Sequence, residues 1–110
     1  MGNDTAAEAG PVNVQARPKK PASASYEDNK ARALSTDVAV RADLAAREDA
    51  EPEILYYLTD DESGIVRRNL AINPCTPVKA NLILAQDDED DVRMELARKI
   101  CRLAVRVPSF

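Results

Sequence analysis

The 110-residue chain contains no histidine and no tryptophan, and it has only three glycines and two cysteines. Without histidine it lacks the side chain that most often acts as a general base near neutral pH and binds transition metals. Aromatic residues make up 4% of the chain, too few for a platform that stacks single-stranded nucleic acid. No apolar run approaches the ~18 residues that cross a bilayer, and no signal-peptide core begins the chain. We therefore expect a cytoplasmic protein that is not an enzyme and has no metal, cofactor or membrane segment.

The charge balance also bears on nucleic acid as a partner. The chain has 15 Lys and Arg against 19 Asp and Glu, a net charge of -4. Proteins that bind nucleic acid mainly through its phosphates present an excess of positive charge. A protein partner is therefore expected for the chain as a whole, rather than nucleic acid.

Residues 1–25 differ in composition from the rest of the chain. They contain no Leu, Ile or Phe, and three prolines interrupt them. Such a segment cannot bury enough apolar surface to offset the entropy lost on ordering. We predict a disordered leader over residues 1–25 and a folded domain over residues 26–110.

From about residue 26 onward the sequence repeats every 26 residues. Four residue types recur over two steps: Val40, Val66 and Val92; Arg41, Arg67 and Arg93; Leu44, Leu70 and Leu96; and Ala45, Ala71 and Ala97. The same step relates Leu58 to Leu84 and Asp61 to Asp87. Repeats of 20 to 50 residues are typical of solenoids, in which each unit stacks on the next.

Prolines and capping residues divide each repeat into two helices. The expected helices cover residues 26–34, 38–47, 52–59, 66–72, 77–85 and 90–105. Pro74 ends one helix, and Thr76 followed by Pro77 is a good N-cap and first residue for the next. The run Ser35, Thr36 and Asp37 is expected to cap the helix over residues 38–47, and Ser63 is expected to cap the helix over residues 66–72. In the last helix, the apolar spacing predicts buried Val92, Leu96, Ile100 and Leu103.

The segment 66–77, followed by residues 84–87 and the Val92–Arg93 pair, resembles the leucine-rich-repeat variant and the related short HEAT-like repeats of bacteria. Residues 25–28, 52–58 and 96–100 are similar to the N-terminal repeat segments of one bacterial family of unknown function. The resemblance covers about residues 25–104. It implies an all-α fold, a short right-handed α-solenoid of about three HEAT-like helical pairs, and it implies no activity.

The repeated arginines are the most regular charged feature. Stacked repeats would bring Arg41, Arg67 and Arg93 into a ladder beside Asp61 and Asp87, because the planar guanidinium can hold a carboxylate and loop carbonyls together. In HEAT-like repeats such a ladder is structural, and the resemblance implies the same role here. A row of anion-binding sites is the alternative.

Two other groups are candidates for contact with a partner. Tyr56 and Tyr57 are adjacent, so they cannot both face the core, and tyrosine is common in interface hot spots. Arg98, Arg102 and Arg106 form a basic stripe on the last helix, which favours an acidic protein or, alternatively, nucleic acid. Apolar residues on the same helix predict that it is covered by a second copy, by another protein or by a further domain.

The two cysteines and the acidic run are assigned structural roles. Cys75 and Cys101 lie 26 residues apart and are expected to be small buried apolar residues, because adjacent helical layers are too far apart for a disulfide. The acidic residues 87–91 lack the glycine hinge and terminal glutamate of a calcium loop. We interpret them as a helix-capping turn.

Overall fold

The computed structural model describes residues 19–106, and the side chains of residues 25–104. Within residues 19–106 every regular element is helical, which confirms the predicted all-α class. The elements are α1 (Lys19–Ala33), α2 (Val38–Ala45), α3 (Pro52–Tyr57), the short 3-10 helix η2 (Leu58–Asp60), α4 (Gly64–Ile72), α5 (Val78–Leu84) and α6 (Asp90–Arg106). Residues 1–18 of the predicted leader lie outside the described residues, and α1 begins at Lys19.

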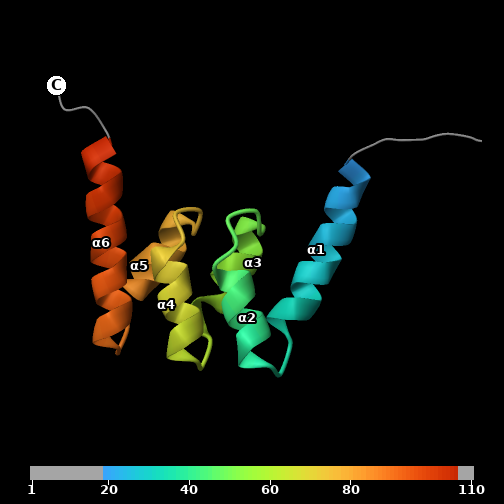
Figure 1. Ribbon diagram of the computed structural model, residues 1–110, viewed down its shortest axis with the longest axis horizontal. Helices are drawn as coiled ribbons and strands as arrows, with labels where there is room; N and C mark the ends of the chain where they lie inside the picture. The colour runs from blue at the N-terminus through green and yellow to red at the C-terminus, as the bar shows by residue number, and fades with distance from the viewer. Residues whose placement is uncertain (1–18, 107–110) are drawn as a thin grey trace, which may run out of the picture.

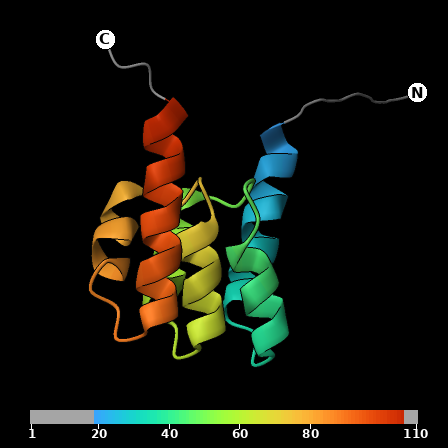
Figure 2. The same ribbon diagram turned by 60° about the vertical axis from the view of Figure 1, so that its left-hand side comes forward.

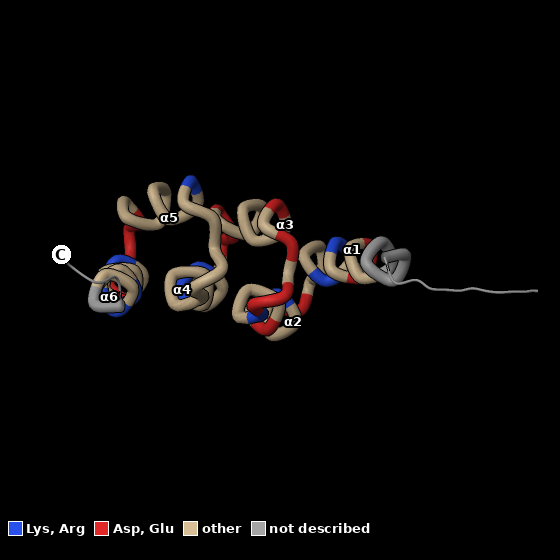
Figure 3. Tube along the Cα trace, turned by 90° about the horizontal axis from the view of Figure 1, so that it is seen from above, with Lys and Arg blue, Asp and Glu red and all other residues tan. Residues whose placement is uncertain are grey.

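The helices form two rows. Helices α2, α4 and α6 stand side by side in one row, α3 and α5 form the other, and α1 lies at the N-terminal end (Figures 1 and 3). Figure 2 shows α6 (red) in front of α4 (yellow), with α5 (orange) to the left of α6. The most extensive contacts of α4 are with its two row neighbours, α6 and α2. Helices α4 and α6 thus each pack on the row helix that lies 26 residues earlier in the chain.

The core lies between the rows and is built from the repeated apolar positions. Val66 and Val92 are completely buried, as are Leu44 and Leu70, and Leu96 is 3% exposed. From the second row, Ile54, Leu55, Leu58 and Leu84 close the core. Burying one such side chain contributes about 1.5–3 kcal/mol, so the repeated positions supply most of the stabilisation from apolar burial.

Two of the predicted caps are confirmed. The side chain of Asp37 accepts a hydrogen bond from the Ala39 N–H at 2.9 Å, and Ser63 accepts one from the Ile65 N–H at 3.3 Å. The predicted cap Thr76 is wrong. Its hydroxyl is buried and donates to the Leu70 carbonyl at 2.8 Å, so it serves the end of α4, and Pro77 is the N-cap residue of α5.

The predicted core face of α6 is also partly wrong. Ile100 is 52% exposed and Leu103 is 39% exposed, whereas Lys99, next to Ile100, is 1% exposed. The buried face follows Val92, Leu96 and Lys99, with steps of four and three residues, because two steps of four drift around a helix with 3.6 residues per turn.

Cys75 and Cys101 are both exposed, so the expectation that they are buried is wrong. Cys75 lies in the turn between α4 and α5, directly after Pro74. Cys101 lies on α6, on the side turned away from the buried Lys99. Both positions show that a repeated position is buried only where the neighbouring repeat covers it.

Asn73 joins two consecutive helices of the first row. Its side chain is buried, and its Nδ2 donates to the carbonyls of Ala45 at 3.0 Å and Arg47 at 2.9 Å, at the C-terminal end of α2. Its Oδ1 accepts a hydrogen bond from the Cys75 N–H at 2.9 Å. Asn73 therefore caps the preceding repeat and shapes its own turn.

Replacing Asn73 by alanine is expected to lower the free energy of unfolding by about 2 kcal/mol, because three hydrogen bonds are lost and buried carbonyls lose a partner. Urea denaturation followed by circular dichroism measures the change. Asn69→Ala is the matched control, since the Asn69 side chain makes a single inter-repeat bond, to the Ala42 carbonyl at 2.9 Å. Equal losses in the two variants would contradict the capping role of Asn73.

Candidate functional site

A ladder of arginine and aspartate side chains links the turns that precede α2, α4 and α6. Arg41 donates from Nε to Asp61 Oδ2 at 2.8 Å and from Nη2 to Asp61 Oδ1 at 3.2 Å. Arg67 holds Asp87 in the same way, at 2.7 and 3.3 Å. In both cases Nη1 donates to the carbonyl six residues earlier, Ser35 at 2.8 Å and Asp61 at 2.6 Å.

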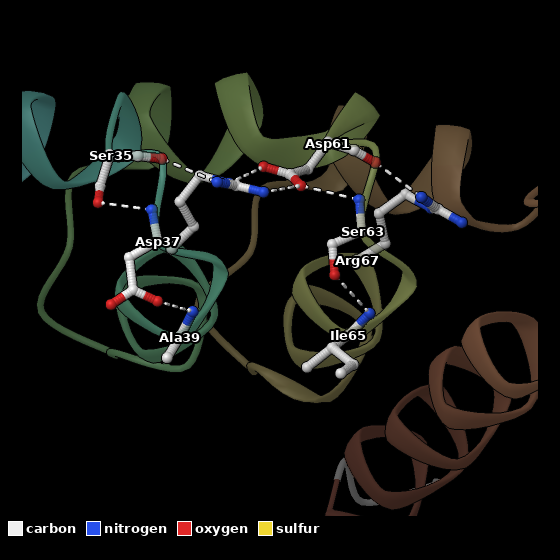
Figure 4. A network of polar contacts seen from close by, with 8 residues as sticks. Ser35, Asp37, Ala39, Asp61, Ser63, Ile65 and Arg67 are labelled. Carbon is white, nitrogen blue, oxygen red and sulfur yellow. Dashed lines mark hydrogen bonds and ion pairs between the residues drawn. The ribbon is translucent and has the colours of Figure 1, made fainter.

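Each aspartate of the ladder therefore contacts two arginines, one through its carboxylate and one through its backbone carbonyl. Figure 4 shows the carbonyl of Asp61 directed at Arg67, and its carboxylate bound to the Ser63 N–H, at 2.9 Å. The hydrogen bond to Asp87 raises the pKa of the Arg67 guanidinium above its already high ordinary value, so this group stays charged. The carboxylate-binding edges of Arg41 and Arg67 are thus occupied by aspartates of the same chain, each 20 residues further along.

Arg93 occupies the third position of the ladder and keeps the contact with the carbonyl six residues earlier, but its carboxylate partner is different. It donates to the Asp87 carbonyl and to the carboxylate of Asp90, three residues earlier on the chain. The Arg93 side chain is 42% exposed, compared with 11% for Arg41 and 14% for Arg67. The ladder is thus open at α6.

A surface with several hollows surrounds Tyr57 of α3. Tyr57 is 55% exposed and Tyr56 is 39% exposed, so both of the predicted contact residues reach the surface. Tyr57 lines three hollows. One of about 250 Å³ lies between α1 and α3 and has mostly apolar walls, which include Tyr26, Leu34 and Ile54.

The other two hollows extend from the same residue in different directions. One of about 320 Å³ runs from Tyr57 past Tyr56 to Ile83 of α5. The other, of about 470 Å³, reaches towards the turn after η2, where Asp60, Asp61 and Glu62 line it. We call the surface formed by these three hollows the Tyr57 surface.

Charge around the Tyr57 surface is mainly acidic. Glu53 lines two of the three hollows, and three further acidic residues line the largest. Arg41 lines the largest hollow, where it pairs with Asp61, and Lys30 lines the hollow between α1 and α3. Lys30 Nζ is 5.5 Å from the ring centroid of Tyr26, and the nearby Lys79 Nζ is 4.7 Å from that of Tyr56. Both distances are in the range of cation–π interactions, so each lysine already interacts with a tyrosine of the same chain.

The predicted basic stripe lies elsewhere, on α6. The Arg98 side chain is 60% exposed and donates to Glu95 at 3.2 Å, and Arg102 is also exposed. The side chain of Arg106 lies outside the described residues. Helices α3 and α6 belong to different rows, with α4 and α5 between them (Figure 3), so the tyrosines and the basic stripe do not form a single site.

Lys99 is an unusual residue that sequence reasoning missed. Its amine donates to the carbonyls of Leu70 at 3.3 Å and Asn73 at 2.8 Å, and to Asn81 Oδ1 at 2.9 Å. Burial lowers the pKa of Lys99 to about 8. The 26-residue step contains a signal for this role, because Lys99 occupies the repeat position of Asn73 and caps the end of α4 as Asn73 caps α2.

Within residues 19–106, no cluster of three or more Cys, Asp or Glu side chains has a geometry that could hold a metal ion. In the same range, no helix combines the length and the apolar character that crossing a bilayer requires. Comparisons of the chain with protein-family models, curated proteins and solved structures found no match.

Proposed function

We propose that this chain is a short right-handed α-solenoid of HEAT-like repeats that acts as a non-catalytic protein-interaction module. The proposal of a solenoid is supported by the 26-residue step, which relates buried leucines, helix caps and ladder arginines in successive helices. In a solenoid each repeat contacts its neighbours, and the exposed faces are free to bind partners.

The Tyr57 surface carries the proposal of protein binding. Tyrosine offers a large apolar ring and a hydroxyl at little cost in conformational entropy, and it is enriched in interface hot spots. Here an exposed tyrosine stands among three hollows that are formed by four helical elements, α1, α3, η2 and α5. A partner that covers Tyr57 can place side chains on several sides of it.

The walls of the hollows indicate the chemistry of the partner. The hollow between α1 and α3 is lined mainly by apolar side chains and suits an aliphatic or aromatic side chain. In the largest hollow Asp61 is already paired with Arg41, but Asp60 and Glu62 are exposed and suit a neighbouring lysine or arginine. We therefore expect a protein segment in which an apolar residue is flanked by basic residues.

Replacing Tyr57 by alanine is expected to weaken binding of such a segment at least tenfold, about 1.4 kcal/mol, by removing the residue shared by all three hollows. Peptides selected from a random display library on the purified full chain supply the ligand, and isothermal titration calorimetry measures affinity. Ile65→Ala, which truncates a 60% exposed residue of α4, is the matched control. Selected peptides that bind both variants equally well, or that carry no apolar residue with basic neighbours, would contradict the proposal.

Nucleic-acid binding through α6 is the second candidate, and the exposed arginines Arg98 and Arg102 favour it. The acidic residues 87–91 lie at the start of the same helix and oppose the approach of phosphates. Salt-sensitive binding of duplex DNA that disappears in the Arg98→Glu/Arg102→Glu variant would favour this candidate over protein binding.

A further inference from the structure

The outer face of α6 lies at the end of the first row, and no described helix covers it (Figures 1 and 3). The repeated positions show what is missing. Ala45 of α2 and Ala71 of α4 are 0% exposed, and each of these two helices has the next helix of the row packed against it. Ala97, at the same position of α6, is exposed. This face therefore has the composition of a helix–helix contact without the second helix.

Four exposed residues form a narrow apolar stripe along this face: Met94, Ala97, Cys101 and Ala104. Their spacing of three, four and three residues is that of a helix that packs lengthwise against another helix. Met94 is 48% exposed and is the one large member of the stripe. The small side chains of the other three allow a second helix to approach closely.

Charged residues on one flank of the stripe follow a sign pattern that is complementary to itself. In chain order they are Asp91, Glu95, Arg98 and Arg102, two acidic residues followed by two basic ones. If two copies of α6 pack antiparallel, Asp91 of each copy lies opposite Arg102 of the other, and Glu95 lies opposite Arg98. In parallel packing this flank would face the opposite flank of the other copy, so the complementary sign pattern would not be used.

Contacts within the described part of the chain leave Asp91 and Arg102, the first and last of these four residues, available to pair with a second copy. Glu95 already accepts hydrogen bonds from Arg68 at 3.4 Å and from Arg98 at 3.2 Å. By contrast, Asp91 and Arg102 are both exposed, and neither forms an ion pair within the described part of the chain. These two residues are therefore the ones whose charge a second copy would neutralise.

We propose that two copies of this chain associate through α6, antiparallel, about a two-fold axis near Ala97. A two-fold axis pairs a surface with itself, which the order of two acidic and two basic residues satisfies. Antiparallel packing also places the negative C-terminal end of each helix dipole beside the positive N-terminal end of the other. The contact goes beyond the proposed function and uses a different surface, so Tyr57 remains free to bind a partner.

Sedimentation equilibrium of the full chain tests this contact through a charge exchange. The wild type is expected to show a monomer–dimer equilibrium that weakens with added salt. Arg102→Glu places two acidic residues opposite each other, and Asp91→Arg places two basic residues opposite each other. Each change occurs twice across the two-fold axis, and each variant is expected to dissociate about tenfold more readily. The Asp91→Arg/Arg102→Glu double variant restores opposite charges and is expected to dimerise nearly as well as the wild type.

Arg47→Glu, a charge reversal after α2 and away from α6, is the matched control and should leave the equilibrium unchanged. Circular dichroism verifies that each variant is folded. A wild type that stays monomeric at millimolar concentration would overturn the proposal and leave the face for a different protein. It would also be overturned if folded single variants dimerise as the wild type does, or if the folded double variant fails to recover. None of these outcomes alters the peptide-binding test of Tyr57.

Discussion

Replacing Arg67 by alanine is expected to lower the free energy of unfolding by about 3–5 kcal/mol, the usual effect of removing one member of a buried ion pair. The Arg67 side chain is 14% exposed and that of Asp87 is 7% exposed. The alanine variant would leave the Asp87 carboxylate without its bidentate partner and the Asp61 carbonyl without its 2.6 Å donor. Two turns would lose their connection at once.

Arg93→Ala is the matched control, because it removes the same residue type at the same repeat position. Its side chain is 42% exposed and pairs with Asp90, which is 84% exposed, so a loss below about 1 kcal/mol is expected. Urea denaturation followed by circular dichroism gives both values. If both variants lost the same free energy of unfolding, the buried pair of Arg67 would stabilise the fold no more than the exposed pair of Arg93, and the prediction would be contradicted. Arg67→Lys should fall between wild type and Arg67→Ala, because lysine cannot form the bidentate contact.

The second large effect is a dependence of stability on pH through Lys99. Burial lowers the pKa of this amine to about 8 in the folded protein, whereas an unperturbed lysine titrates near 10.4. Between these two pKa values the unfolded chain binds a proton at Lys99 that the folded protein has released. The free energy of unfolding contributed by this group therefore rises with pH in that window, by up to about 3 kcal/mol. Below pH 8 both states are protonated and the contribution is constant.

The difference in free energy of unfolding between wild type and Lys99→Met isolates this contribution, because methionine does not titrate. That difference is expected to grow in favour of the wild type from pH 8 to pH 10.5. Replacing the exposed Lys79 by methionine controls for the general effect of removing one positive charge. A difference that stays flat over this range would show that the buried amine keeps its proton, held by the three oxygens that accept its hydrogen bonds.

Several features of the fold could be predicted from the sequence because they depend on neighbours along the chain. Asp37 and Ser63 act as N-caps, as expected, since a cap bonds to the backbone two residues later. Pro52 begins α3. Proline has no backbone N–H to donate, and this costs nothing at the first helical position, where an N–H would have no partner within the helix. Leu58 and Leu84 are buried at matching positions of two repeats. The 26-residue step relates Arg41 to Arg67 and Asp61 to Asp87, and the structure forms the same ion pair in both repeats.

Predictions that needed knowledge of the neighbouring helix were less successful. Thr76 has the sequence context of a cap, yet its hydroxyl bonds backwards to Leu70, because the turn is buried against the end of α4. Lys99 is charged and would be expected at the surface. It is instead buried because three oxygens from α4, its turn and α5 converge on its amine. No local pattern around residue 99 reveals that convergence.

The sequence by itself determined the helical class, the 26-residue step and the residue types that recur at each position, since these follow from local propensity and hydrophobic spacing. Only the tertiary structure decided what each recurring residue does. Ala45 and Ala71 are buried while Ala97 is exposed, and Arg67 is enclosed by carboxylates while Arg93 is not. The physical reason is that burial and ion pairing each require a second element in contact with the residue. A recurring residue is therefore buried or paired only where another helix packs against it.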